Sequence, residues 1–293
     1  MSRSGFVALA GRPNVGKSTL INRMVGEKVA IVSDRPQTTR RAIRGVCCRD
    51  GCEIVLVDLP GVQRPRDALT GRMAGRVRQE LADADAALLV LNGEQGVGPG
   101  DRYIARVLAA GALPVVIAVN KMDRLSRQAA VTVLSRAAEL QAEWEVFPVS
   151  ARNGAGVESL IEHLRTLMPR GPFMFGGGAT SDQPPELMLA ELVREAVIAR
   201  TFNELPHAVE VLVEELERPR AGLVRMRVLV WVESESQKRI VIGARGRMIS
   251  SIGRAARKEL ERALDAHVHL DLTVRVRPRW RSDDALLDRL GIT

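Results

Sequence analysis

Residues 6–19 read FVALAGRPNVGKST, an apolar run that leads into a glycine-rich loop and then into a helical pattern. Positions 11–18 fit G-x-x-x-x-G-K-[ST], and a loop between a strand and a helix is the setting in which that pattern binds phosphate. The glycines let backbone N–H groups turn toward phosphate oxygens, Lys17 can bridge the β- and γ-phosphates, and the Ser18 hydroxyl can ligate Mg²⁺. The loop residues that we expect to contact a nucleotide are Gly11, Arg12, Pro13, Asn14, Val15, Gly16, Lys17, Ser18 and Thr19.

Apolar runs and helical patterns alternate over the first 168 residues. The apolar runs, each bounded by turn residues, are FVALAG, EIVLVDLPG, AALLVLNG, PVVIAVNK and EVFPVSA. The amphipathic stretches between them are Lys17–Val25, Arg72–Ala82, Arg102–Ala110 and Val157–Leu167. This alternation predicts repeated βα units with right-handed crossovers, and therefore a doubly wound α/β domain with a parallel sheet.

The composition excludes several classes of protein. The chain has 293 residues, which suits two domains, and 46% of them are hydrophobic, which excludes a disordered chain. The formal charge of +8 favours a polyanionic partner or surface. Aromatic residues make up only 3%, so a nucleic-acid surface would depend on charge and backbone amides more than on stacking.

The N-terminus has no signal-peptide pattern, and no apolar run reaches the roughly eighteen residues of a membrane span. We therefore expect a cytoplasmic, reduced protein with no transmembrane segment. The three cysteines, Cys47, Cys48 and Cys52, have no second pair or nearby histidine to complete a metal site, so we interpret them as small strand or turn residues.

The composition changes at Met168–Pro185, which reads MPRGPFMFGGGATSDQPP and is too rich in glycine and proline for a helix or a central strand. We predict a nucleotide-binding domain over residues 1–168, a linker over 169–185 and a second domain over 186–293. The second domain reads helix, strand, strand, helix, helix, strand and a closing helix, a compact α+β module. Its predicted elements are Glu186–Arg200, His207–Glu217, Gly222–Glu233, a short helix ending at Gly243, Arg247–Leu264, His267–Arg277 and Asp283–Leu290.

Three shorter motifs end predicted strands of the first domain. D-x-x-G at 58–61 supplies a carboxylate for the water shell of a metal and a glycine amide near the γ-phosphate, although this motif alone is weak. N-K-x-D at 120–123 places Asp123 to accept from N1–H and the exocyclic amine of guanine, a donor pair that adenine lacks; a strand-end cap is the alternative. The tripeptide at 150–152 can present a backbone N–H to guanine O6. The nucleotide-binding residues that we assign here are Asp58, Leu59, Pro60, Gly61, Asn120, Lys121, Asp123, Ser150, Ala151 and Arg152.

These four motifs, in this order and each at a strand end, resemble the translation-factor class of GTPases. The resemblance implies GTP and GDP as ligands, with Mg²⁺ held by Ser18, Asp58 and a threonine of the first switch. Thr38 and Thr39 are both candidates, and we prefer Thr39 because related members carry the ligand just before the arginine, here Arg40. A solvated loop threonine is the alternative.

The residue that usually orients the attacking water is missing. Val62 follows Gly61, where Ras-like relatives carry a glutamine, so we expect slow intrinsic hydrolysis unless a cation or a partner supplies positive charge. Asn14 offers one route: its carbonyl oxygen can hold a monovalent cation such as K⁺, as in GTPases that carry G-x-P-N-x-G-K-[ST]. The alternative is an asparagine that braces the loop.

Charge is nearly balanced in the C-terminal part but is segregated along it. Residues 1–179 carry 24 basic and 17 acidic side chains, whereas residues 180–293 carry 19 and 18. Within the latter, residues 237–258 contain seven Lys or Arg and no acid, and residues 204–217 contain five acids and no Lys or Arg. The sequence therefore predicts one basic face.

The basic stretch contains IVIGARGRMISSIG at 240–253, in which G-x-x-G lies between two apolar helical patterns. It resembles a KH domain, in which two glycines let the backbone approach the phosphates of single-stranded RNA; a plain helix–helix turn is the alternative. The candidate RNA-binding residues are Gly243, Ala244, Arg245, Gly246 and Arg247. Further on, Arg275, Arg277, Arg279 and Arg281 alternate, so those that continue the last strand share one face, and a solvated edge is the other interpretation.

A GTPase domain joined to a C-terminal KH module resembles the Era family of bacterial ribosome-assembly GTPases over the whole chain. The motifs that carry the resemblance are GRPNVGKST at 11–19, QTTR at 37–40, ELPH at 204–207, VIGARG at 241–246 and WRSDD at 280–284 with the ending at Leu290-Gly291. It implies binding to the 3′ end of small-subunit (16S) ribosomal RNA, a role in small-subunit (30S) assembly and partial association with the cell membrane. Two departures are Leu59, where the family usually has threonine, and the glycine-rich linker, where it has a more acidic segment.

We therefore predict a GTP-hydrolysing switch, a monomer, in which nucleotide state reorganises the loops around Thr39 and Val62 and alters how the KH module meets RNA. Two alternatives are a GTPase whose basic C-terminal module docks on an anionic membrane surface and an RNA chaperone that uses GTP only structurally.

Overall fold

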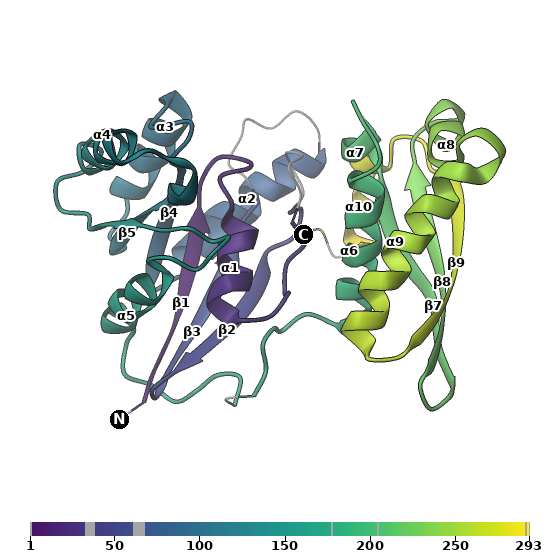
Figure 1. The fold of residues 1–293 in the computed structure, drawn as a ribbon, viewed down its shortest axis with the longest axis horizontal. Helices are drawn as coiled ribbons and strands as arrows, with labels where there is room; N and C mark the ends of the chain where they lie inside the picture. The colour runs from purple at the N-terminus through teal and green to yellow at the C-terminus, as the bar shows by residue number, and fades with distance from the viewer. Residues whose placement is uncertain are drawn as a thin grey trace. The chain divides into compact units, whose positions relative to one another are not determined.

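The chain forms two compact units, and their boundary lies between Asp182 and Gln183. The computed structural model describes residues 2–32, 39–60, 68–176, 178–203, 205–290 and 292. The two units are shown in Figure 1, and each is considered by itself.

The first unit contains a six-stranded sheet in the order β2-β3-β1-β4-β5-β6 (Figure 1). Neighbouring strands are parallel except β2, which is antiparallel to β3. The elements are β1 Arg3–Ala10, α1 Lys17–Val25, β2 Ile43–Arg49, β3 Cys52–Asp58, α2 Ala68–Ala82, β4 Ala86–Asn92, α3 Pro99–Ala109, β5 Val115–Asn120, the 3-10 turn η1 Met122–Arg124, α4 Arg127–Ala138, β6 Val146–Pro148 and α5 Val157–Leu167. The predicted doubly wound sheet is confirmed.

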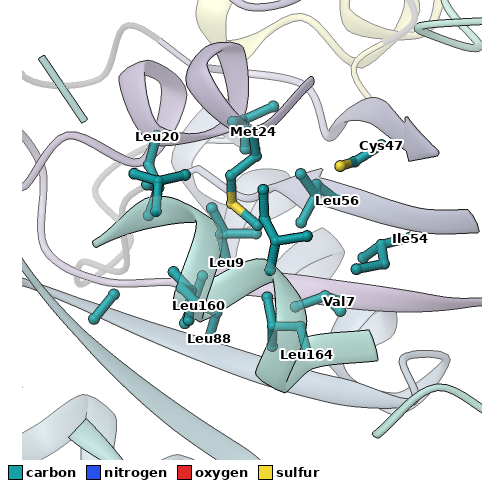
Figure 2. Packing of buried hydrophobic residues seen from close by; sticks show 14 of the residues in the cluster. Val7, Leu9, Leu20, Met24, Cys47, Ile54, Leu56, Leu88, Leu160 and Leu164 are labelled. Atoms are coloured by element: carbon teal, nitrogen blue, oxygen red, sulfur yellow. The ribbon is translucent and has the colours of Figure 1, made fainter. Parts of the chain in front are cut away.

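Helices cover both faces of this sheet because successive strand residues point to opposite sides. On one face, Val7 and Leu9 of β1 pack with α1 and α5, as Figure 2 shows around Met24 and Leu160. On the other face, apolar residues of the strands pack against α2, α3 and α4. Both faces are buried, so the loops at the carboxyl ends of the strands remain as the natural binding edge.

The predicted strands do not include β2, which is an antiparallel edge strand and not part of a βα unit. Its hairpin with β3 turns through Asp50 and Gly51, both with positive φ (39° and 77°), a two-residue turn that Asp-Gly favours. Cys47 and Cys48 lie in β2 and Cys52 in β3, all as free thiols, in line with their interpretation as small strand residues. Burial raises the pKa of Cys47 to about 11.

The first part of the predicted linker is bound to the first unit. Ser4 N–H donates to the carbonyl of Pro169 at 3.1 Å, and Val46 N–H of the edge strand β2 donates to Thr180 at 2.9 Å. The fully buried Glu53 carboxylate accepts from the backbone N–H groups of Met174 (2.6 Å) and Phe175 (3.2 Å). An edge strand leaves N–H and C=O groups unpaired, and this segment satisfies some of them.

The second unit is an α+β module with a three-stranded sheet in the order β7-β8-β9, in which β7 and β8 are antiparallel and β8 and β9 parallel. Its elements are α6 Pro185–Ile198, α7 Leu205–Ala208, β7 Glu210–Arg220, β8 Leu223–Val232, α8 Glu235–Ile242, the 3-10 turn η2 Ala244–Gly246, α9 Arg247–Leu264, β9 His267–Val276, the 3-10 turn η3 Trp280–Ser282 and α10 Asp284–Arg289. Helices α6, α8 and α9 share one core with the sheet. The predicted element order is confirmed except for α7, which was not predicted and which takes up the first residues of the predicted strand His207–Glu217.

Candidate functional site

The phosphate-binding loop joins the end of β1 to the start of α1, and two of its positions admit only glycine. A Cβ atom at Gly11 would lie 2.6 Å from the carbonyl oxygen of Val90, and one at Gly16 (φ 99°) would overlap the side-chain amide of Asn120. Asn14 adopts φ 63°, a left-handed conformation that asparagine tolerates better than most residues. The curled conformation of the loop therefore depends on glycine at positions 11 and 16.

Lys17 is buried in the first turn of α1. Its ammonium group donates to the carbonyls of Gly11 (3.3 Å) and Arg12 (3.4 Å). Burial lowers the pKa of Lys17 below its ordinary value, and the charge of Asp58 acts against that shift. The Lys17 ammonium group is thus held against the loop by two backbone carbonyls. An anion bound in the loop can replace these carbonyls as the partner of the ammonium group.

The three residues predicted to ligate Mg²⁺ meet at one point. Ser18 Oγ donates to Asp58 Oδ2 at 2.5 Å, Thr39 Oγ1 donates to the same oxygen at 3.2 Å, and the two hydroxyl oxygens lie 3.3 Å apart. The other carboxylate oxygen of Asp58 is buried and has no hydrogen-bond partner in the described part of the chain. Burial raises the pKa of Asp58, and Lys17 and the two hydroxyls oppose this. Three oxygen donors with one unsatisfied carboxylate oxygen fit a small divalent cation.

The base-side motifs are held to the phosphate loop by Asn120. Its side-chain nitrogen donates to the carbonyl of Val15 at 3.0 Å, while its oxygen accepts from the backbone N–H groups of Lys121 (2.8 Å) and Ala151 (2.9 Å). Lys121 has φ 66°, and its ammonium donates to the carbonyl of Asn14 at 3.0 Å. One amide thereby fixes three loops relative to one another.

Asp123 is exposed, but its orientation is set by a buried neighbour. Ser150 Oγ donates to Asp123 Oδ1 at 2.6 Å, and this hydrogen bond holds the pKa of Asp123 below its ordinary value. The second carboxylate oxygen remains for a ligand. The N–H of Ala151 already donates to Asn120. For residues 150–152 to recognise guanine O6, this N–H must be shared between Asn120 and the base, or the N–H of Arg152 must donate instead.

Two contacts at this site were not indicated by the sequence. Arg23 of α1 donates to the carbonyls of Ala151 (3.2 Å) and Arg152 (2.5 Å), and Arg12 forms an ion pair with the fully buried Asp101 of α3 at 2.8 Å. Both contacts join residues far apart in sequence, so no local pattern could have revealed them. They brace the base-side loop and the phosphate loop from outside the motifs.

Some predicted residues lie outside the described part of the chain, namely Thr38, Gly61 and Val62. Of their neighbours, Leu59 and Pro60 are buried at the end of β3.

In the second unit, the G-x-x-G turn lies between α8 and α9 as predicted. Gly243 has φ 72°, and a Cβ there would lie 2.6 Å from Met248 Cβ, whereas a Cβ at Gly246 (φ 74°) would meet only Ile249 Cγ2 at 4.0 Å, an ordinary contact. Arg245 and Arg247 are exposed, and so is Ile240 in α8. The turn thus presents two guanidinium groups and the N-terminus of the 18-residue helix α9 together.

The alternating arginines at 275–281 do not form one basic face. The strand β9 ends at Val276, so only Arg275 belongs to it. Arg277 lies over the ring of Trp231 at 5.5 Å, and Arg281 forms an ion pair with Glu233 at 2.7 Å. These contacts leave neither a single basic face nor a wholly solvated edge.

Comparison with known proteins decides the family. Residues 6–121 match the family model described as 50S ribosome-binding GTPase, and residues 204–281 match that of the KH domain. GTPase Era of Carboxydothermus hydrogenoformans is 39% identical over 99% of this chain and 98% of its own length. The chain belongs to the Era family. GTPase Era of Mycobacterium avium is 42% identical with the same coverage, so the chain is a GTPase that hydrolyses GTP.

Solved Era structures share the fold over the full length. A crystal structure of Era in complex with MgGDPNP and nucleotides 1506–1542 of 16S ribosomal RNA is 31% identical, covers 100% of both chains and has a TM-score of 0.96. An Aquifex aeolicus Era variant bound to GDP and AlF₄⁻ is 31% identical over 99% of each chain, with a TM-score of 0.95. Both units of this chain therefore have the Era folds, a P-loop GTPase sheet and a KH domain.

Two further findings concern the described residues only. None of their helices is both long and apolar enough to cross a bilayer. Within the same residues, no group of three or more His, Cys, Asp or Glu side chains is placed to hold a metal ion.

Proposed function

We propose that this GTPase is a molecular switch that binds small-subunit ribosomal RNA near its 3′ end through the turn at 243–247 and assists assembly of the 30S subunit. The observation that carries the proposal is that turn. It presents two exposed arginines and a helix N-terminus in a chain that matches an RNA-bound Era over its whole length. Since that RNA is cytoplasmic, so is the proposed site of action.

In this proposal, the phosphates of GTP lie in the loop 11–16 and replace backbone carbonyls as partners of Lys17. Mg²⁺ is held by Ser18, Thr39 and Asp58, whose oxygens already converge. The cation offsets negative charge on the phosphates when it is bound. Thr39 enters this set from the first switch, so loss of the γ-phosphate releases that loop and changes the state of the protein.

Guanine is recognised by Asp123, which accepts from N1–H and the exocyclic amine while Ser150 holds the carboxylate in place. Asn120 keeps this base-side loop in register with the phosphate loop. Adenine has neither donor at these positions, so the same contacts reject it.

Hydrolysis requires positive charge near the transferred phosphate, and a glutamine is absent at position 62. Asn14 is exposed at the rim of the phosphate loop and can present an oxygen to K⁺ there. We therefore propose K⁺ as an additional cofactor.

The test uses the difference between the two glycines. Because a Cβ at Gly243 clashes with Met248, substitution there would distort the turn whatever its charge, whereas Gly246 has space for a side chain. Asparagine tolerates positive φ, so Gly246→Asn is a control of equal size without the charge of Gly246→Asp.

Labelled RNA from the small-subunit 3′ end is titrated with wild type and both variants at several salt concentrations. Gly246→Asp should lose most of the RNA affinity, Gly246→Asn should keep most of it, and GTP hydrolysis without RNA should be unchanged in both. Equal RNA affinity in all three proteins would refute the RNA assignment. A parallel titration with anionic vesicles tests the membrane alternative, which would be favoured if Gly246→Asp weakened vesicle binding but not RNA binding.

A further inference from the structure

The basic surplus of the chain lies in the nucleotide-binding part and not in the KH part. Residues 1–179 carry a net charge of +7 (24 minus 17), whereas residues 180–293 carry +1 (19 minus 18). A protein whose polyanion binding used only the KH turn would not need this surplus. A surface of the first unit that concentrates unpaired arginines is therefore a candidate for a second contact.

Helix α3 has such a surface. Its buried side carries Asp101, Ile104, Ala105 and Leu108, and its exposed side includes Arg102, Tyr103, Arg106 and Val107.

The two arginines of α3 are four positions apart in sequence, so they lie about 40° apart around the helix and about 6 Å apart along it. Neither guanidinium has an ion-pair or hydrogen-bond partner in the described part of the chain. Tyr103, the only tyrosine of the chain, lies beside them with 58% of its surface exposed.

We propose that this exposed face of α3 is a second RNA contact, in which Arg102 and Arg106 pair with backbone phosphates and an unpaired base stacks on Tyr103. Guanidinium groups bind phosphate with two parallel hydrogen bonds, and an exposed ring offers every base a flat surface. The inference rests on the proposed RNA-binding function and adds a surface outside the KH domain.

Helix α4 of the same unit serves as a comparison for the exposed arginines of α3. Its exposed arginines, Arg127 and Arg136, are nine residues apart and therefore point to opposite sides, and no aromatic residue lies between them. Elsewhere in the first unit, the exposed Arg124 and the half-buried Arg165 form ion pairs with glutamates. The arrangement on α3 thus differs from α4 in the spacing of its arginines and in the tyrosine beside them, and from Arg124 and Arg165 in the absence of a partner among the described residues.

The face is also rigidly supported. Asp101, next to Arg102, forms the ion pair with Arg12 of the phosphate loop and accepts from the N–H of Gly98 at 2.9 Å. These contacts of Asp101 fix the backbone of the first turn of α3, which carries the exposed side chains. A fixed backbone reduces the ordering cost of binding.

The experiment uses the full chain and full-length small-subunit ribosomal RNA. The parent protein carries Gly246→Asp, so that remaining RNA binding reports on surfaces other than the KH turn. Into this parent and into wild type we introduce Arg102→Ala with Arg106→Ala, Tyr103→Ala or Tyr103→Phe. The matched control is Arg127→Ala with Arg136→Ala, which removes the same charge from α4. GTP affinity, expected to be unchanged in the α3 and α4 variants, serves as the folding control.

Removal of the two α3 arginines should lower the salt dependence of RNA binding by about 1.4 to 1.8 in the log–log slope, because each phosphate contact contributes about 0.7 to 0.9. Tyr103→Ala should weaken binding about 5- to 100-fold with little change in slope, and Tyr103→Phe should not. The α4 control should bind like its parent.

Equal loss in the α3 and α4 double variants, or no loss in either, would overturn the proposal. If Gly246→Asp abolishes binding and the α3 variants of the wild type bind normally, the proposed function stands and only this inference fails. If the α3 variants lose binding to phosphatidylglycerol vesicles and not to RNA, the surface is a membrane contact and the proposal is wrong.

Discussion

Replacement of Asp123 by asparagine changes one atom of the base-side loop and tests the guanine assignment. Ser150 donates to Asp123 Oδ1, and it can donate equally to an amide oxygen, so the side chain should keep its orientation. The outward atom then changes from an acceptor to an NH₂ donor. Guanine presents two donors to this position, whereas xanthine replaces the exocyclic amine with a carbonyl and so presents one donor and one acceptor.

The size of the effect follows from the hydrogen bonds involved. Guanine then loses one hydrogen bond to a charged acceptor, which contributes about 1.5–3 kcal/mol, and its other donor meets a neutral acceptor. GTP affinity should therefore fall about 10- to 10²-fold, while XTP affinity should rise until it exceeds that for GTP.

The assay compares the dissociation constants and hydrolysis rates of GTP and XTP for wild type, Asp123→Asn and Ser150→Ala. The last variant is the matched control, because it removes the orienting hydroxyl and leaves the acceptor pair; it should weaken GTP binding about 10-fold without favouring XTP. An Asp123→Asn protein that still prefers GTP would refute the assignment of residues 120–123 as the base-reading motif.

Two other outcomes can be checked with purified protein. If Asn14 holds K⁺, replacement of K⁺ by Na⁺ at constant ionic strength should slow hydrolysis with little change in GDP affinity, and Asn14→Ala should remove the difference; equal wild-type rates in the two salts would contradict this. Glu53→Leu removes the acceptor of the N–H groups of Met174 and Phe175. It should lower the free energy of unfolding of the first unit by about 1–3 kcal/mol in urea titration and speed proteolysis within residues 171–176. Unchanged cleavage there would show that these hydrogen bonds do not hold the segment.

The sequence was most informative where a motif needs a particular residue type in a particular local setting. The phosphate loop could be predicted because a Cβ has no room at Gly11 and Gly16, so the loop requires glycines that are visible in the sequence. The KH turn could be predicted for the same reason, because Gly243 lies against Met248. The approach of Ser18 and Asp58 was expected because loops at the carboxyl ends of parallel strands meet at one edge of the sheet, whereas Thr39 was expected only from the resemblance to the translation-factor class of GTPases. These features depend on local geometry or on fold topology.

The contacts that the sequence did not reveal all join distant residues with common side chains. Arg23 and Arg12 are two of 38 arginines, and only the folded chain shows that one holds the base-side loop and the other pairs with Asp101. In the sequence, Glu53 is an ordinary residue of a predicted strand. Only the folded chain shows that it accepts hydrogen bonds from the segment after α5. The strand β2 does not fit the βα repeat because it pairs antiparallel with β3, and Asp50-Gly51 is the only local signal of its hairpin.

The central claim is that the KH turn of this GTPase binds the 3′ end of small-subunit ribosomal RNA. Crosslinking of the protein to RNA in living cells, followed by sequencing of the recovered RNA, tests it most directly. We predict that wild type and Gly246→Asn recover reads concentrated near that 3′ end and that Gly246→Asp loses them. Reads spread along the RNA without enrichment at the 3′ end, or equal recovery by Gly246→Asp, would contradict the account.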